Sequence, residues 1–140
     1  GVIGMCMTGN FALTLALDPW VPAPVTSQPG LPASTPFRNR DGGLQMRTDE
    51  KTRFAERGID AMGLRFEGDA LCKAARFDAI RDLVGSDRFD EHVIADVHRN
   101  PDGPLKHAHA VLTADLVDAE ESVTKQKLIE VIKFLKARIS

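Results

Sequence analysis

Four short apolar runs separated by helical patterns limit the folds open to this sequence more than any other feature. The runs are rich in Val, Ile, Leu, Met or Phe, and each has the length of a strand; they cover residues 1–5, 21–27, 62–66 and 92–97. Alternation of strands with helices is typical of a parallel sheet whose faces are covered by helices. The sequence therefore predicts an α/β fold with about four parallel strands.

Helices are predicted between and after these strands, at residues 10–17, 49–57, 73–84 and about 123–139. Gly58 and Gly85 directly follow two of them, at the position where glycine commonly ends a helix. Phe54 is expected to point inward from an otherwise polar helix. The irregular stretch 28–46 is too long for a simple connection, and it is interpreted as a surface excursion or part of the wall of a site.

The last predicted helix carries large aliphatic residues at spacings of four, three and four. This spacing predicts one apolar stripe that faces the core, made of Leu128, Ile132, Leu135 and Ile139. Ser122 or Thr124 is expected to cap its first turn, because a side-chain hydroxyl there can accept a hydrogen bond from a main-chain N–H group.

Length and charge exclude several classes of function. The chain of 140 residues suits one domain, residues 1–140, and its first residues already read as a strand, which predicts that the domain is truncated at its N-terminus. Eighteen basic against 20 acidic residues give a net charge of −2, which argues against nucleic-acid binding. The sequence contains no run of about 18 apolar residues, so no membrane span is predicted. Two cysteines form no disulfide framework, which favours a reduced, cytoplasmic setting.

Cys6 lies where the first strand ends and an apolar helix begins. A nucleophile on such a sharp turn projects above the sheet, and small residues are needed around it because strand and helix backbones approach closely. Gly4 and Gly9 meet this need, and Thr8 meets it less well. The helix N-terminus favours a thiolate, and the main-chain N–H of Met7 could donate to an oxyanion. The alternative is a small buried cysteine that only packs, which is also how we interpret Cys72.

An acidic residue and a pair of histidines follow the third and fourth strands. Asp69 stands at the carboxyl edge of the sheet, where it could orient a histidine; alternatively it caps a helix, and Glu67 is a second candidate. His107 and His109 point to opposite sides of an extended segment, so only one would face the thiol as general base. Surface histidines or a zinc site are the alternatives, but no further Cys/His cluster is visible, and no metal or cofactor is predicted.

The order of these residues links them. A nucleophile, an acid and a histidine that each follow a strand of a parallel sheet are in the chain order of α/β-hydrolases. The separations of 63 residues (69 − 6) and 40 residues (109 − 69) leave room for strand–helix units in between.

Several motifs in this order resemble the C-terminal part of the dienelactone hydrolase (carboxymethylenebutenolidase-like) family of the α/β-hydrolase superfamily. The resemblance covers the elbow in residues 1–17, the Ser-Gln-Pro-Gly-Leu-Pro segment 27–32, the acid region 63–77, and His109-Ala-Val-Leu-Thr followed by the final helix. It implies half of a doubly wound sheet and a triad of Cys6, Asp69 and His109, with His109 chosen over His107. The implied activity is hydrolysis of a small-molecule ester or lactone through a thioester acyl-enzyme.

Three departures from the family pattern qualify this expectation. Thr8 replaces a glycine often found in the elbow. Thr113 stands where the best-studied members have an arginine that holds a substrate carboxylate, so dienelactone itself is in doubt as substrate. The first half of the family's fold is missing. The alternative is therefore a degenerate fragment that needs a partner or its missing half, and the bare edge of the first strand predicts association or dimerisation.

Overall fold

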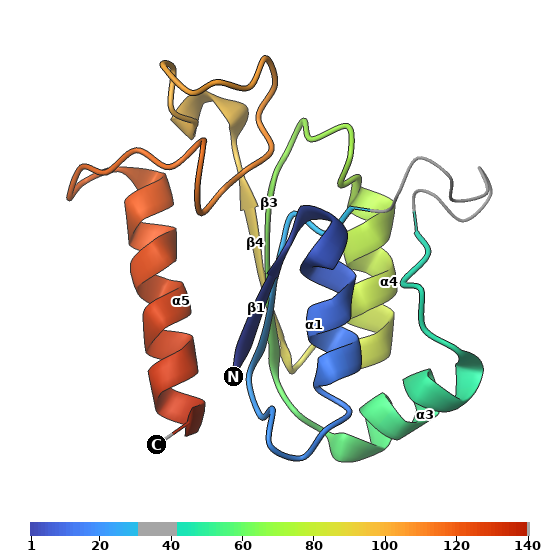
Figure 1. The fold of residues 1–140 in the computed structure, drawn as a ribbon. Helices are drawn as coiled ribbons and strands as arrows, with labels where there is room; N and C mark the ends of the chain where they lie inside the picture. The colour runs from blue at the N-terminus through green and yellow to red at the C-terminus, as the bar shows by residue number, and fades with distance from the viewer. Residues whose placement is uncertain (31–41, 140) are drawn as a thin grey trace.

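The structure, a computed structural model, describes residues 1–30 and 42–139. Its centre is one sheet of four strands in the order β1-β2-β3-β4, and all neighbouring pairs are parallel (Figure 1). The strands are β1 (Val2–Met5), β2 (Pro24–Ser27), β3 (Ala61–Phe66) and β4 (Phe89–Ile94). The predicted α/β fold with four parallel strands is confirmed.

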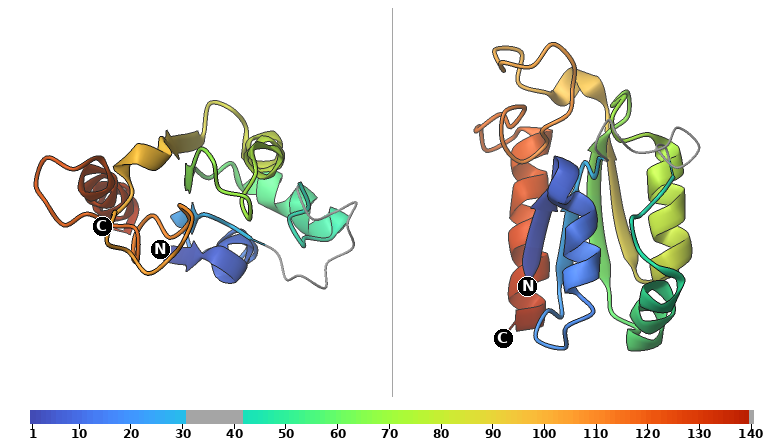
Figure 2. Two further views of the ribbon diagram at one scale, coloured as in Figure 1. Left: turned by 90° about the horizontal axis from the view of Figure 1, so that it is seen from above. Right: turned by 45° about the vertical axis from the view of Figure 1, so that its right-hand side comes forward.

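Helices cover both faces of this sheet. On one face lies α5 (Val123–Ile139), and on the other lie α1 (Gly9–Leu15), α3 (Thr48–Arg57) and α4 (Ala74–Val84), as Figures 1 and 2 show. Two short 3₁₀ helices, η1 (Cys6–Thr8) and η2 (Asp96–His98), follow β1 and β4. None of the helices in the described ranges is long and apolar enough to cross a membrane.

The inner strand β3 contributes to a hydrophobic core on each side of the sheet, because its side chains alternate between the two faces of the sheet. All six of its residues are buried, as expected for a parallel strand covered on both sides. Met62, Leu64 and Phe66 pack with α5, whereas Ala61 belongs to the core under α1, α3 and α4. The sheet is thus a rigid layer that fixes where its loops emerge.

The predicted strand ends differ most from the observed ones in β2 and β4. β2 begins only at Pro24, because proline lacks the N–H group that the interior of a sheet requires, and the first position of a strand tolerates it. β4 begins at Phe89, before the predicted His92, and ends at Ile94, because the chain then turns into η2.

Helix ends follow the predicted signals. Gly58 adopts the left-handed conformation (φ 58°, ψ 32°) that ends α3, and Gly85 follows α4 with a φ of 97°. Phe54 is buried, as predicted. The hydroxyl of Ser122 accepts the N–H of Lys125 at 3.2 Å, so Ser122 caps α5.

The predicted stripe on α5 is wrong in part. Val131 and Phe134 are the large apolar residues that the helix buries, whereas Ile132 is 42% and Ile139 is 56% exposed. Aliphatic residues occur on two adjacent sides of this helix, and contact with β2, β3 and β4 selects the side that carries Val131 and Phe134.

Candidate active site at the carboxyl edge of the sheet

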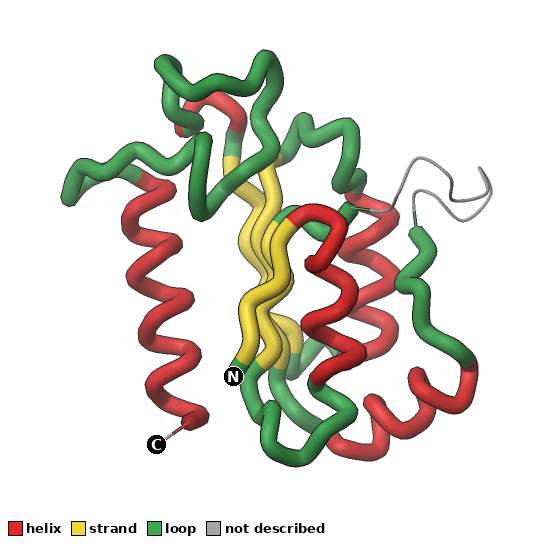
Figure 3. The backbone as a smooth tube through the Cα atoms, viewed as in Figure 1, coloured by secondary structure: helices red, strands yellow, loops and turns green. Residues whose placement is uncertain are grey.

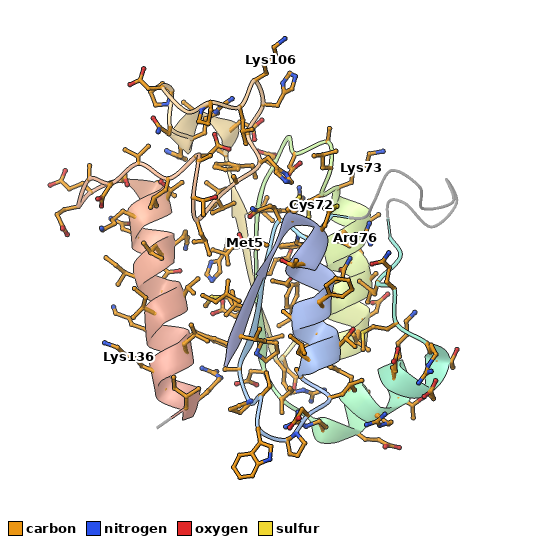
Figure 4. All side chains as sticks on the ribbon, viewed as in Figure 1. Met5, Cys72, Lys73, Arg76, Lys106 and Lys136 are labelled. Carbon is orange, nitrogen blue, oxygen red and sulfur yellow. The ribbon has the colours of Figure 1, made fainter. Side chains whose placement is uncertain are left out.

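The loops that follow the parallel strands gather at one end of the sheet, the upper end in Figure 3. Three of them carry the predicted site residues, and we name them the elbow (residues 4–9), the acid loop (67–72) and the histidine loop (99–115). Figure 4 shows Met5, Cys72 and Lys106, which belong to these three loops, toward that end of the molecule, with Lys136 far below. Strand direction alone therefore brings distant parts of the sequence to one edge.

Cys6 lies on a sharp turn between β1 and η1 and is partly exposed. Its φ of 51° is in the left-handed region, which an L-residue with a side chain adopts only at a cost of about 1–2 kcal/mol. Strain at the end of a strand is typical of a nucleophile elbow, but Gln28, directly after β2, also has a positive φ (36°).

Close packing explains why glycine flanks the turn. A Cβ atom on Gly4 would lie 2.3 Å from the carbonyl oxygen of Thr8, and one on Gly9 would lie 2.6 Å from the Cα of Pro29. Both positions are thus closed to any larger residue without a backbone shift, as the sequence predicted.

Thr8, the departure from the family pattern, bridges the elbow rather than distorting it. Its Oγ1 accepts the main-chain N–H of Met5 at 3.0 Å and donates to the carbonyl oxygen of Met5 at 2.7 Å. Because Val2 donates its N–H to Ala23 on the β2 side, the main-chain groups of Met5 point to the open side of β1. Thr8 therefore satisfies groups that a neighbouring strand would otherwise pair.

The segment after β2 closes the elbow from the other side. The N–H of Gly30 donates to the carbonyl oxygen of Cys6 at 2.9 Å, and the Asn10 side chain donates to the carbonyl of Gly30 at 3.4 Å. A predicted site wall at residues 28–46 is thus supported at Gly30, and residues 31–41 lie outside the described ranges. The prediction is wrong for Leu44 and Met46, which are buried in the core under α1, α3 and α4.

Asp69 and His109 form the central polar contact of the site. Asp69 Oδ2 lies 2.7 Å from His109 Nδ1, and the carboxylate is 3% exposed. Asp69 Oδ1 accepts the N–H groups of Leu71 at 2.9 Å and Cys72 at 3.2 Å. Asp69 does not cap α4, whose N-cap residue is Lys73; it orders the turn before α4 with one oxygen and contacts the histidine with the other.

The environment raises the pKa of His109 to about 9. The hydrogen bond to Asp69 is the main cause; burial opposes the rise, and the Cys6 side chain adds to it. Nε2 is buried and forms no hydrogen bond with any described residue. Because Nδ1 faces a carboxylate, it carries the proton in the neutral ring, and Nε2 is the free basic nitrogen.

The other candidates take no part in this contact. Within the described residues, the exposed side chains of His107 and Glu67 form no hydrogen bond with Asp69 or His109, although His107 lines a cavity beside that pair. Burial raises the pKa of the Cys72 thiol to about 12, so Cys72 packs in the core as interpreted from the sequence. Met7 directly follows Cys6 within η1, and its role as an oxyanion donor stays a prediction.

Two residues that position the histidine loop were missed at the sequence level. Asp115 is fully buried, and its Oδ2 accepts the main-chain N–H groups of His109 and Ala110, both at 2.9 Å. Its Oδ1 lies 3.0 Å from Nε of Arg99. The one available signal was a carboxylate inside the apolar run that follows His109, since such a residue is buried only with partners.

Within residues 1–30 and 42–139, no group of three or more His, Cys, Asp or Glu side chains could hold a metal ion.

Comparisons of the chain with models of protein families, with curated proteins and with solved structures found no match.

Proposed function

We propose that this chain is a hydrolase of carboxylic esters or lactones, similar to the dienelactone hydrolase family, with Cys6 as nucleophile, His109 as general acid and base, and Asp69 as its orienting carboxylate. The observation that carries the proposal is the 2.7 Å contact between Asp69 Oδ2 and His109 Nδ1, while Nε2 of His109 has no hydrogen-bond partner among the described residues. The strained backbone of Cys6 is independent support.

The proposed reaction has two halves. The Cys6 thiolate attacks the carbonyl carbon, and the Met7 N–H donates to the oxyanion that forms. Collapse of the tetrahedral intermediate breaks the bond to the leaving oxygen, which takes a proton from the His109 imidazolium and leaves a thioester. Neutral His109 then removes a proton from water at Nε2, the hydroxide attacks the thioester, and the acid departs as the Cys6 thiolate and the His109 imidazolium are restored.

The raised pKa of His109 suits the first half of this cycle. At neutral pH the imidazole is mainly protonated, because its pKa is about 9, so a proton for the leaving group is already in place. An imidazolium next to a thiol also stabilises the thiolate by charge.

The test is hydrolysis of aryl and alkyl esters and of small lactones by the purified chain, with Cys6→Ala as the loss variant and Cys72→Ala as the matched control. Cys6→Ala is expected to lower kcat/KM by at least about 10³-fold, and Cys72→Ala to leave it near the unmodified value. A trapped adduct of one acyl group, located on Cys6 by mass spectrometry, would support the covalent step. Equal turnover by Cys6→Ala would refute the assignment.

A second candidate function is assembly with another polypeptide, here a second copy of the chain. Ile3 and Met5 of the edge strand β1 are 41% and 37% exposed, and Met7 of η1 with Phe11 and Leu15 of α1 are more than half exposed. Exposed apolar side chains on and next to an open strand edge favour association. Sedimentation velocity is expected to show a dimer that Phe11→Lys dissociates; a monomer at all concentrations would exclude this role.

A further inference from the structure

A cavity of about 300 Å³ lies between the acid loop and the histidine loop. Residues 69–71 form one side, and Leu105 with residues 107–109 forms the other. Asp69 and His109 are thus among the residues that line it, and a molecule in this cavity would lie next to the proposed general acid, whose Nε2 atom is buried in this structure.

The remainder of the wall is apolar. Leu71 is 65% and Leu105 is 38% exposed, so both side chains present apolar surface on the two sides of the cavity. Ala108, between the two histidines, is nearly buried and adds a small apolar surface. A site of this kind, mostly apolar with a few placed polar groups, is typical of a pocket for a small molecule.

The residues that line the cavity offer little positive charge to an anionic group. The described lining holds no lysine or arginine, and the carboxylate of Asp69 already pairs with His109 and two main-chain N–H groups. A substrate carboxylate placed here would lose water and meet two leucines, because the one cation of the wall that the proposed function requires, the His109 imidazolium, is already paired with Asp69.

We infer that this cavity holds the leaving-alcohol portion of the substrate and that this portion is uncharged and apolar, an aliphatic or single-ring aryl alcohol. The inference rests on the proposed function. The leaving oxygen must come within hydrogen-bond distance of His109 to receive its proton, so the alcohol portion lies on the side where His109 forms the wall. The volume is at the small end of ligand pockets, which fits a short or single-ring group.

The experiment compares acetate esters that differ only in the alcohol: phenyl and butyl acetate against the acetate ester of glycolate, which carries a carboxylate. The unmodified chain is expected to prefer the uncharged alcohols. Leu71→Ala with Leu105→Ala is expected to lower this preference, as a kcat/KM ratio, by about tenfold. Leu105→Lys is expected to shift it toward the glycolate ester, and Leu15→Ala, an exposed leucine of α1, to leave it unchanged. The inference would be overturned if the unmodified chain preferred the glycolate ester. It would also be overturned if neither the double leucine variant nor Leu105→Lys changed the kcat/KM ratio.

A binding measurement separates this inference from the proposed function. The Cys6→Ala variant is titrated with phenol, butanol and benzoate while the methyl NMR signals of Leu71 and Leu105 are followed. Selective shifts with phenol and butanol but no ester turnover by the unmodified chain would support the pocket and refute the hydrolase. Turnover that depends on Cys6, with no shift of either leucine, would refute the pocket and leave the hydrolase standing.

Discussion

Arg99 and Asp115 form an ion pair that fastens both ends of the histidine loop, with Nε of Arg99 3.0 Å from Oδ1 of Asp115. The Arg99 guanidinium also donates to the main-chain carbonyls of Leu105 and Lys106, and Asp115 accepts the N–H of His109 at 2.9 Å. The position of the imidazole is therefore set from two sides: Asp69 orients its ring, and the Arg99–Asp115 pair holds its backbone.

Asp115→Ala is expected to lower the free energy of unfolding by about 3–5 kcal/mol, because it leaves the largely buried Arg99 guanidinium without a carboxylate and two main-chain N–H groups without an acceptor. Arg99→Lys keeps the charge but loses the fork that reaches the two carbonyls, and it should reduce kcat more than stability. Urea unfolding and ester turnover of the same preparations measure both effects. Unchanged values for both variants would show that the pair positions nothing.

The pH dependence of stability should reveal the Asp69–His109 contact. The folded-state pKa of His109, about 9, lies above the ordinary value of 6.5, so the contact contributes fully below pH 6.5 and its contribution disappears as the pH rises through about 9. The free energy of unfolding of the unmodified chain should therefore fall across this range relative to His109→Gln. Urea titrations at several pH values give the difference, and parallel profiles for the two proteins would contradict the assignment.

Sequence order predicted much of the candidate site because Cys6, Asp69 and His109 each follow a strand, and parallel strands deliver their following loops to one edge. Asp115 and Arg99 could not be found in this way, because their contacts join two parts of one irregular loop and no periodic pattern marks them. The prediction of the buried side of α5 was wrong for a different reason. Ile132 and Val131 are equally apolar, and only packing against the sheet decides which of them is covered.

Alkylation should distinguish the two cysteines. Iodoacetamide at neutral pH is expected to modify Cys6, which is partly exposed, and to spare Cys72, which is buried with a thiol pKa of about 12. Peptide mapping of the native and the urea-unfolded protein checks this, since both cysteines should react after unfolding. Equal labelling of both in the native protein would mean that the region before α4 opens readily.

The close approach at the elbow gives a paired substitution. Gly4→Ala is expected to lower the free energy of unfolding by about 1–3 kcal/mol or more, since its Cβ would lie 2.3 Å from the Thr8 carbonyl oxygen. Gly30→Ala, also next to Cys6, meets its nearest atoms at 3.8–3.9 Å and should be tolerated. Thermal unfolding of the two variants side by side measures the loss of stability in each. Equal losses would argue against a close approach between Gly4 and Thr8 in the turn.

Thr8 provides the last test, because its hydroxyl makes both hydrogen bonds to Met5 while its methyl group makes neither. Thr8→Val keeps the shape of the side chain and removes the hydroxyl, so it should lower the free energy of unfolding by about 1 kcal/mol. Because the turn that holds Cys6 becomes looser, the variant should also slow the alkylation of Cys6. Thr8→Ser keeps the hydroxyl and should retain both properties. The freed main-chain groups of Met5 would also lengthen the open edge of β1, so Thr8→Val should associate more strongly in sedimentation than Thr8→Ser. If the two variants behave alike in all three measurements, the hydroxyl bridge has no part in shaping the elbow or in shielding the strand edge.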